Sequence, residues 1–253
     1  MLPEVSVLMP IHNGERYLFE AVESVQQQTL KSWELVAVLD RCTDATRNIL
    51  ERFGDSRIRL LDGPQPGGLV RSLNLGLAQC RAPLVARLDA DDVCEPERLA
   101  MQKQVLDARA VLVAVGSGAI LIDADSRVIG SRAVVCGTGR LRRRLLWRCS
   151  LIHPSVMFRR DPVLALGGYA EDASRAQDYE LWLRIAALGD IDNLPVPLIR
   201  YRVHSGQISS ARYHPRFGML LKARMTLAER CGISSAGTLF RHSAWMIRQY
   251  TRR

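Results

Sequence analysis

The chain has 253 residues, of which 47% are hydrophobic and 24% charged, with 35 Lys and Arg against 26 Asp and Glu. This composition is that of a globular protein, and it excludes collagenous, low-complexity and wholly disordered chains. The formal net charge of +9 predicts an anionic partner, which can be a nucleic acid, an anionic lipid or a phosphate-bearing substrate.

The six cysteines include no C-x-x-C pair, and the apolar run near the N-terminus lacks the basic flank and cleavage site of a secretory signal. The longest apolar stretch, residues 111–122, is interrupted by Gly116-Ser117-Gly118 and is too short to cross a bilayer. We therefore expect reduced thiols and a cytoplasmic protein without a membrane span.

Strands and helices are predicted to alternate through the first half of the chain. Strands are expected at 5–9, 33–39, 58–61, 84–88 and 112–115, and helices at 17–28, 45–53, 69–78 and 96–107. This alternation favours a mostly parallel sheet covered on both faces, in which ligands bind beyond the carboxyl ends of the strands.

The second half is less regular and much more basic. It mixes strand-like segments at 155–158 and 198–202 with helical ones at 178–187, 217–231 and 236–250. Residues 1–139 hold 15 basic and 18 acidic side chains, whereas residues 140–253 hold 20 and 8. The chain contains no internal repeat and no low-complexity linker, so we expect one domain with a basic C-terminal extension.

The first two strands are followed by residues suited to contact a nucleotide. Pro10-Ile11-His12-Asn13-Gly14 favours a tight turn with exposed backbone N–H groups, which can meet a phosphate or a base, or be only a turn. After the second strand, Thr43 or Asp44 can cap the next helix. Asp40 is then left to accept hydrogen bonds from a nucleobase imide or a ribose.

Three carboxylates follow the fourth strand, at Asp89, Asp91 and Asp92. Their mutual repulsion lowers stability unless a cation or hydrogen-bond donors compensate. Mg²⁺ and Mn²⁺ prefer such oxygen ligands and usually bind through one or two carboxylates plus substrate phosphates. The pattern favours a site for Mg²⁺ or Mn²⁺ over a solvated loop.

A series of motifs, in order along residues 4–210, resembles family 2 glycosyltransferases of the GT-A fold. The motifs are PIHN at 10–13, Asp40 with TDAT at 43–46, RSLNLGLA at 71–78, LDADD at 88–92, PERL at 96–99, HPS at 153–155, GGY at 167–169, QDYELW at 177–182 and YRVH at 201–204. The resemblance implies a Rossmann-like α/β domain over 1–210, with a mostly parallel central sheet flanked by helices. Within it we expect a nucleotide-sugar half (1–115) and an acceptor half (116–210), followed by a helical basic extension (211–253).

The same resemblance implies an inverting transferase and assigns roles to individual residues. The expected donor is a nucleoside-diphosphate sugar, most simply a UDP-sugar, and the expected acceptor is a hydroxyl of a glycan or lipid-linked molecule in bacterial cell-surface polysaccharide or lipopolysaccharide assembly. The expected nucleotide contacts are Pro10, His12, Asn13, Asp40, Arg71 and Asp89. The expected metal ligands are Asp89, Asp91, Asp92 and His204. Asp178 falls at the position of the catalytic base, and Arg202 is a candidate partner of the diphosphate.

The chain departs from the family pattern at two of these positions. Leu39-Asp40 stands where the family often has two acidic residues, and Gln177-Asp178 stands where it often has Glu-Asp. The first departure leaves the choice of nucleotide open. Asp178 also precedes a predicted helix, so an N-capping role is the alternative for this residue.

Two other classes of function would each explain one feature of the sequence. A nucleotide-binding oxidoreductase would explain Gly116-Ser117-Gly118, but the third glycine of that fingerprint is missing and the motif follows the fifth predicted strand, not the first. A nucleic-acid-binding module would explain the net charge, but aromatic residues are only 6% and are not interleaved with the basic runs.

The basic residues of the second half suggest a further partner. Residues 141–148 mix four arginines with leucine and tryptophan, and residues 217–250 contain Lys222, Arg224, Arg230, Arg241 and Arg248. Such segments can lie on an anionic membrane surface or can be ordinary solvated helix faces.

Overall fold

The computed structural model describes residues 2–173, 176–207 and 217–251. The expected boundary between residues 210 and 211 lies outside these ranges. The strands are β1 (Val5–Ile11), β2 (Trp33–Leu39), β3 (Ile58–Asp62), β4 (Leu84–Arg87), β5 (Val93–Cys94), β6 (Leu112–Ile122), β7 (Val128–Arg132), β8 (Met157–Arg159) and β9 (Asp190–Arg202). The α-helices are α1 (Leu18–Gln26), α2 (Thr46–Arg52), α3 (Leu69–Gln79), α4 (Arg98–Ala108), α5 (Thr138–Leu145), α6 (Arg160–Ala165), α7 (Gln177–Leu188), α8 (Phe217–Arg230) and α9 (Ser235–Thr251). Two short 3₁₀ turns lie at His153–Ser155 and Glu171–Ala173.

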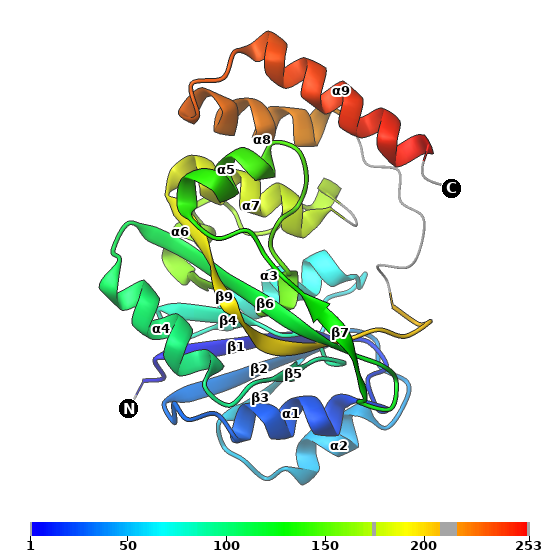
Figure 1. The fold of residues 1–253 in the computed structure, drawn as a ribbon. Coiled ribbons are helices and arrows are strands. Elements are labelled where there is room, and N and C mark those ends of the chain that lie inside the picture. The colour runs from blue at the N-terminus through cyan, green and yellow to red at the C-terminus, as the bar shows by residue number, and fades with distance from the viewer. Residues whose placement is uncertain (1, 174–175, 208–216, 252–253) are drawn as a thin grey trace.

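The strands form one mixed sheet in the order β3-β2-β1-β4-β8-β6-β9-β5, with β7 paired to β6 (Figure 1). β3, β2, β1 and β4 are parallel, as the alternation of elements predicts. β8 lies antiparallel between β4 and β6, while β6 and β9 run parallel to each other. The α/β fold is confirmed, and each antiparallel pair of the sheet involves β5, β7 or β8.

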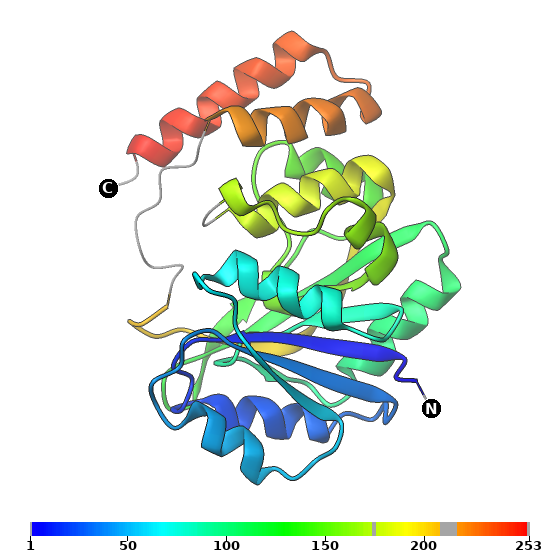
Figure 2. The same cartoon turned by 180° about the vertical axis from the view of Figure 1, so that it is seen from behind.

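Helices cover both faces of the sheet because the strands are apolar on both sides. In β1, Leu8 packs with Leu73 and Leu77 of α3, whereas Val7 and Met9 pack on the opposite face with α1, α2 and α4. Figure 2 shows α3 and α7 on one side of the sheet and α1 and α2 on the other. Beyond α7, α8 and α9 form a further helical layer that packs on α7 (Figure 1).

β6 is much longer than the predicted strand at 112–115, because it continues through Gly116-Ser117-Gly118 to Ile122. The register with β9 shifts next to Gly118. A Cβ atom on Gly116 would lie 2.3 Å from Oδ1 of Asn193, so a glycine is needed for this close approach. The glycine motif therefore lies inside a strand and does not open a phosphate-binding loop, which removes the basis of the oxidoreductase reading.

The register brings the functional loops together. Ile11 of β1 pairs with Leu39 of β2, and Leu8 pairs with Arg87 of β4, so the carboxyl ends of these three strands meet at one edge. At the far end of the sheet, β5 pairs with Arg200 of β9. This pairing returns the end of β9 to the loop that follows β4.

Candidate active site

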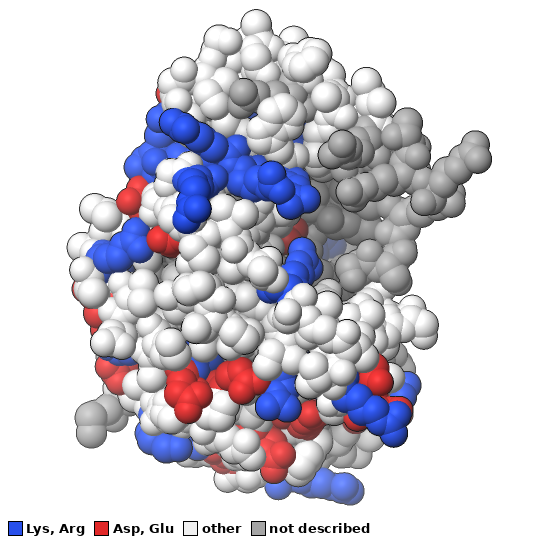
Figure 3. All heavy atoms as spheres, viewed as in Figure 1, with Lys and Arg blue, Asp and Glu red and all other residues white. Residues whose placement is uncertain are grey.

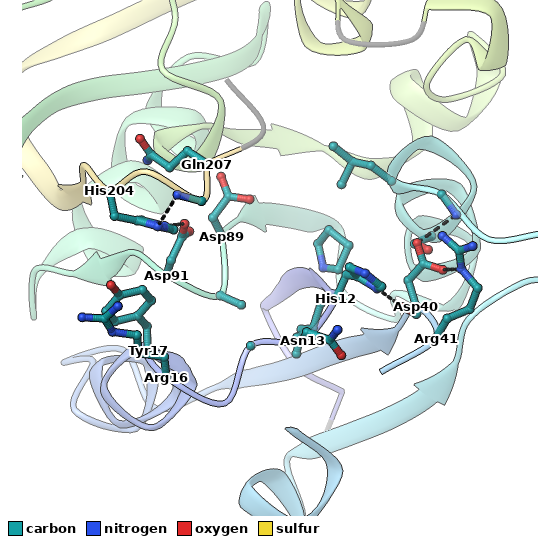
Figure 4. Close-up of a pocket in the computed structure, with 18 of the residues that line it drawn as sticks. His12, Asn13, Arg16, Tyr17, Asp40, Arg41, Asp89, Asp91, His204 and Gln207 are labelled. Atoms are coloured by element: carbon teal, nitrogen blue, oxygen red, sulfur yellow. Dashed lines mark hydrogen bonds and ion pairs between the residues drawn. The ribbon is translucent and has the colours of Figure 1, made fainter. Parts of the chain in front are cut away.

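A cavity of about 740 Å³ lies at the carboxyl ends of β1, β2 and β4 (Figure 4). Its walls come from the loop after β1, Asp40 and Arg41 after β2, the start of α3, the loop after β4 and the segment after β9. The volume is within the usual range for small-molecule sites. The cavity is lined by Pro10, Ile11, His12, Asn13, Gly14, Arg16, Tyr17, Asp40, Arg41, Gly68, Leu69, Ser72, Asp89, Ala90, Asp91, Ala124, His204, Ser205, Gly206 and Gln207.

His12 and Asp40 form one end of the cavity. Nδ1 of His12 donates to the backbone oxygen of Asp40 at 2.6 Å, which leaves Nε2 of the neutral ring as an acceptor. The Asp40 carboxylate is nearly buried and accepts from the Gly68 backbone N–H at 2.8 Å and from Nε of Arg41 at 3.1 Å. Because a carboxylate offers about four lone-pair sites, Asp40 can still accept a hydrogen bond from a ligand.

The loop after β1 is tied to the loop after β2. Asn13 has a positive φ of 52°, and its amide oxygen accepts from the Thr43 backbone N–H at 2.8 Å. The backbone N–H of Gly14 donates to Oγ1 of Thr46, and that of Glu15 donates to Asp44. The expectation of exposed N–H groups is therefore wrong at Gly14, because Thr46 of the neighbouring loop accepts from it.

The turn before α3 closes over Asp40. A Cβ atom on Gly67 would lie 2.0 Å from Oδ1 of Asp40, and Gly68 has a φ of +134°. The close approach therefore favours glycine at position 67, and the left-handed backbone conformation favours it at position 68. The turn also directs the N-terminus of α3 toward the cavity, where the helix dipole favours negative charge.

The three acidic residues after β4 form the other end of the site. Oxygen atoms of Asp89, Asp91 and Asp92 lie within 4.8 Å of one another. Asp92 is 1% exposed, and its Oδ2 has no hydrogen-bond partner within the described residues. A buried carboxylate oxygen without a donor, beside two further carboxylates, fits the donor set of a divalent cation.

The charges of this cluster oppose one another in the absence of a cation. Burial, and then the charge of Asp89, raises the pKa of Asp91, while the hydrogen bond from His204 lowers it. Burial and the charges of Asp89 and Asp91 raise the pKa of Asp92 well above its usual range. A bound cation would relieve this repulsion and favour the ionised carboxylates.

Arg202, at the end of β9, holds the acidic loop in place. Its side chain is fully buried, its backbone N–H donates to Oδ1 of Asp92 at 2.8 Å, and its Nε donates to the backbone oxygen of Asp91 at 2.8 Å. Nη1 donates to Asp123 and Ser126, and Nη2 pairs with Glu20 at 2.6 Å. The expected pairing of Arg202 with a diphosphate is wrong, because all three guanidinium nitrogens are engaged within the protein.

His204 contacts Asp91 directly. Its Nε2 lies 2.9 Å from Oδ2 of Asp91, and its Nδ1 accepts from the Gly206 backbone N–H at 3.2 Å. Since Nδ1 accepts, Nε2 carries the proton and donates to the carboxylate. In this arrangement His204 orients Asp91, and a role as a direct metal ligand stays a prediction.

Asp178 lies in the first turn of α7, outside the cavity lining but close enough for its charge to interact with that of Asp89. Its Oδ2 is 3.8 Å from Sγ of Cys149, and the carboxylate also accepts from the Tyr179 backbone N–H. Burial raises the pKa of Asp178, and the charge of Asp89 raises it further. A carboxyl with a raised pKa is a better proton acceptor than an ordinary aspartate.

The structure brings most of the predicted residues together. Pro10, His12, Asn13, Asp40, Asp89, Asp91 and His204 line the cavity, and Asp92 lies directly behind them. Arg71 does not line it, because its guanidinium bonds the backbone oxygen of Pro66 at 3.1 Å and Glu171 at 3.2 Å.

The sequence interpretation missed several lining residues. Among them are Tyr17, Ser72, Gly68 and Gln207. The Gly67-Gly68 pair before a predicted helix was a visible signal for a tight turn at the site. Tyr17 gave no such signal: its ring lies against Arg202, with the guanidinium 4.5 Å from the ring centre, and the two residues are far apart in the sequence.

All six cysteines are free thiols in the structure. Within the described residues, no helix has the length and apolar character needed to cross a bilayer.

Comparisons with known proteins identify the family of the chain. The sequence pattern of the family described as "Glycosyl transferase family 2" matches residues 6–167. The amylovoran biosynthesis glycosyltransferase AmsE of Erwinia amylovora is 32% identical over 82% of this chain and 79% of its own length. The O-antigen biosynthesis glycosyltransferase WbnJ of Escherichia coli is 29% identical over 85% of this chain and 86% of its own length.

Solved structures share the fold. TarS residues 1–349 of S. aureus, crystallised in complex with UDP-GlcNAc, superposes with a TM-score of 0.73 at 18% identity, covering 98% of this chain and 73% of that one. The complex of the same protein with UDP superposes with a TM-score of 0.70. At this identity the likeness establishes the GT-A fold alone.

Proposed function

The chain belongs to glycosyl transferase family 2, and from this membership we propose that it transfers a sugar, with inversion, from a UDP-sugar to a hydroxyl of a glycan or lipid-linked acceptor. One observation carries the proposal. A single cavity has hydrogen-bond acceptors of Asp40 and His12 at one end and the carboxylates of Asp89 and Asp91 at the other (Figure 4). A nucleoside diphosphate has the matching polarity, with a hydrogen-bonding base at one end and a diphosphate at the other.

At the base end, Asp40 accepts the imide N–H of uracil, and Nε2 of His12 accepts from the base or the ribose. Asn13 and Pro10 form the adjoining wall. The choice of uridine is supported by the TarS complexes with UDP and UDP-GlcNAc, which share the fold.

At the diphosphate end, Asp89, Asp91 and Asp92 would hold Mg²⁺ or Mn²⁺, with His204 orienting Asp91. A bound cation would supply positive charge to offset the charge that develops on the departing UDP. Arg202 keeps the acidic loop in position, so the carboxylates need little rearrangement when the donor binds.

Asp178 acts as the base. Its carboxylate removes the proton of the acceptor hydroxyl as the hydroxyl oxygen attacks the anomeric carbon from the face opposite UDP. The new C–O bond forms, the bond from the anomeric carbon to the phosphate oxygen breaks, and UDP leaves with the electron pair. The raised pKa of Asp178 suits it to this proton transfer.

The relatives support a role in bacterial cell-surface polysaccharide assembly. AmsE and WbnJ are named for amylovoran and O-antigen biosynthesis, respectively. We extend this class of product to the present chain, with the sugar and the linkage to be established by assay.

The test separates binding from transfer. UDP binding is measured by calorimetry with and without Mn²⁺, and transfer is measured as UDP release from a panel of UDP-sugars in the presence of lipid-linked glycan acceptors. Asp178→Asn should lower transfer at least 1,000-fold and leave Mn²⁺-dependent UDP binding within threefold of the parent. Asp91→Asn should abolish the metal dependence of binding.

Three results would overturn the assignment. Near-normal turnover by Asp178→Asn would remove Asp178 as the base. Equal UDP binding with and without Mn²⁺ in the parent protein would remove the metal site. Binding of NADH in place of UDP would point to an oxidoreductase.

We further propose that an anionic membrane surface is a partner. The exposed side chains of Arg140, Arg143, Arg144 and Arg148, which we call the α5 arginine patch, have no carboxylate within ion-pair distance among the described residues. Figure 3 shows the basic side chains gathered over this part of the molecule, whereas acidic and basic side chains are mixed around β1–β3. Anionic phospholipids attract such a patch.

Two residues from the sequence-based membrane interpretation do not belong to this surface. Arg224 is buried, which corrects that expectation, and Arg230 donates to the backbone oxygens of Ala187 and Leu188. The side chains of Arg241 and Arg248 lie outside those that the structure describes.

Vesicle co-sedimentation tests the membrane proposal. Vesicles containing phosphatidylglycerol should retain the protein at low salt and release it at high salt, while phosphatidylcholine vesicles should not retain it. The triple reversal R140E/R143E/R144E should abolish retention. R52E/R81E/R127E changes the net charge equally, on exposed residues elsewhere, and should reduce retention far less. Equal loss in both triple variants would contradict a local patch.

A further inference from the structure

An arginine is buried where the C-terminal helices meet α7. Arg224 of α8 is fully buried, and its guanidinium lies 4.3 Å from the centre of the Trp245 ring of α9. No carboxylate lies within ion-pair distance of Arg224 among the described residues. Burying a charge without a counter-ion costs folding free energy, so packing alone does not explain an arginine at this position.

The guanidinium is directed at Tyr179. Nη2 and Nε of Arg224 donate to the Tyr179 hydroxyl at 2.8 and 3.2 Å, and Nη1 lies 2.8 Å from Nδ1 of His242. The Tyr179 hydroxyl in turn donates to the backbone oxygen of Leu145 at the end of α5. One hydroxyl therefore joins α5, α7 and α8.

Tyr179 is the residue after Asp178, in the first turn of α7. The Tyr179 backbone N–H donates to the Asp178 carboxylate, so a displacement of Tyr179 displaces a direct partner of that carboxylate. On its other side, Asp178 faces Cys149, four residues beyond Leu145. The Arg224–Tyr179–Leu145 link thus holds both segments that flank Asp178.

We propose that Arg224 and the Tyr179 hydroxyl are positioning residues for Asp178, through which the α8–α9 helix pair sets the placement of the base. The inference rests on the proposed function of Asp178. It makes the C-terminal helices part of the catalytic apparatus, because the transfer step depends steeply on the distance between the base and the acceptor hydroxyl.

The chain offers a matched control at the other end of the same helix. Arg230, also of α8, donates from Nη1 to the backbone oxygens of Ala187 and Leu188 at 2.8 and 2.7 Å. These oxygens belong to the last turn of α7, at the end opposite Asp178. Arg230→Met therefore removes a link between α8 and α7 without touching the turn that carries the base.

The first measurement is steady-state kinetics of transfer from the UDP-sugar that the panel identifies. Arg224→Met and Tyr179→Phe should lower kcat by 10- to 100-fold with KM for the donor within threefold of the parent. Arg224→Lys keeps the cation and a donor for the hydroxyl, and it should recover kcat to within about fivefold of the parent. Arg230→Met should leave kcat within threefold.

The second measurement is amide hydrogen exchange, which needs no substrate. Arg224→Met and Tyr179→Phe should speed exchange in residues 178–182, and Arg230→Met should speed it in residues 185–189 instead. If Arg224→Met does not fold, the kinetics and the hydrogen exchange are both measured on Tyr179→Phe, because this variant loses only one oxygen atom.

The outcomes distinguish this inference from the proposed function. Parent-like kcat and parent-like exchange at 178–182 in Tyr179→Phe would overturn the positioning role while Asp178→Asn stays inactive. If kcat falls by a similar factor in Arg230→Met and in Arg224→Met, the positioning role would also be overturned. The decrease would then come from destabilising α7 as a whole. An active Asp178→Asn would instead refute the base itself.

Discussion

The two halves of the molecule build their parts of the site in different ways. In the half that contains β1–β4, the functional side chains lie directly after strand ends, and the local loops hold them through Gly68, Thr43 and Arg41. In the second half, α7 and the end of β9 supply Asp178 and His204, and the end of β9 is held by partners distant in the sequence: His204 contacts Asp91, which is 113 residues away. Arg202 bonds Glu20, which is 182 residues away.

This difference also separates the charges. Residues 1–139 carry slightly more acidic than basic side chains, whereas residues 140–253 carry 20 basic and 8 acidic ones. The acidic end of the cavity is suited to a metal-bound diphosphate, and the α5 arginine patch belongs to the second half, where we propose a membrane contact. The net charge of +9 is therefore an average over two parts of the chain with different charge.

The largest expected effect comes from removing the residue that joins the halves. Arg202→Met leaves Glu20 without its cation and removes the donors to the backbone oxygens of Asp91 and Asp123, while the backbone N–H that donates to Asp92 is kept. We expect a loss of about 2–4 kcal/mol in the free energy of unfolding, because the two backbone oxygens lose their partners. Urea denaturation measures it.

The control for Arg202 lies two residues away on the same strand. Arg200 pairs with Glu95 at 2.8 Å and is half exposed. Arg200→Ala should cost about 0–1 kcal/mol. Equal losses at both positions would show that Arg202 has no special role in joining the halves.

The pH dependence of transfer separates the base from the donor site. Because burial raises the pKa of Asp178, and because only the ionised carboxylate accepts a proton, kcat should fall as the pH drops through this raised pKa. The acid limb of the profile should lie above the ordinary aspartate value of about 3.9, with a decrease of about tenfold per pH unit below it.

This profile is measured at saturating donor and Mn²⁺, so that protonation of Asp91 or Asp92 does not dominate. An acid limb at the ordinary aspartate value would contradict the effect of burial on Asp178.

A smaller effect is expected at the turn that closes over Asp40. In Gly67→Ala the new Cβ would meet Oδ1 of Asp40 at 2.0 Å, so either the carboxylate or the turn must shift. UDP binding should weaken about tenfold, or about 1.4 kcal/mol. Gly139→Ala places a Cβ in open space and should leave UDP binding unchanged. If calorimetry finds the same UDP affinity for both variants, Asp40 does not bind the nucleobase.

The smallest effect is expected at Arg71. Since its guanidinium pairs with Glu171 outside the cavity, Arg71→Ala should change UDP binding less than threefold. A loss of tenfold or more would mean that Arg71 turns into the cavity when the donor binds, as the family resemblance implies.

The sequence predicted the parallel half of the sheet and the residues at the two ends of the cavity, because both follow from local patterns. β1 and β2 are apolar apart from Ser6 and Glu34 and are followed by polar residues, so Asp40 falls at the carboxyl edge once the strands are parallel. Asp89 reaches the same edge after β4. The predicted strand ended too early, at residue 115, because glycines usually interrupt a strand. The contact that explains Gly116 is with Asn193, which lies 77 residues further along the chain, so local sequence could not show it.

The amino-acid sequence by itself determined the fold class, the family and the residues at the strand ends, because strand periodicity and short motifs are local properties. Only the tertiary structure decided the roles of Arg202, Arg224 and Arg71. An arginine in a sequence is one of many cations, and its function depends on whether folding brings it to a carboxylate, a backbone oxygen, a tyrosine hydroxyl or solvent. In this chain folding buries Arg202 and Arg224 beside the two ends of the proposed reaction site and leaves the α5 arginine patch exposed.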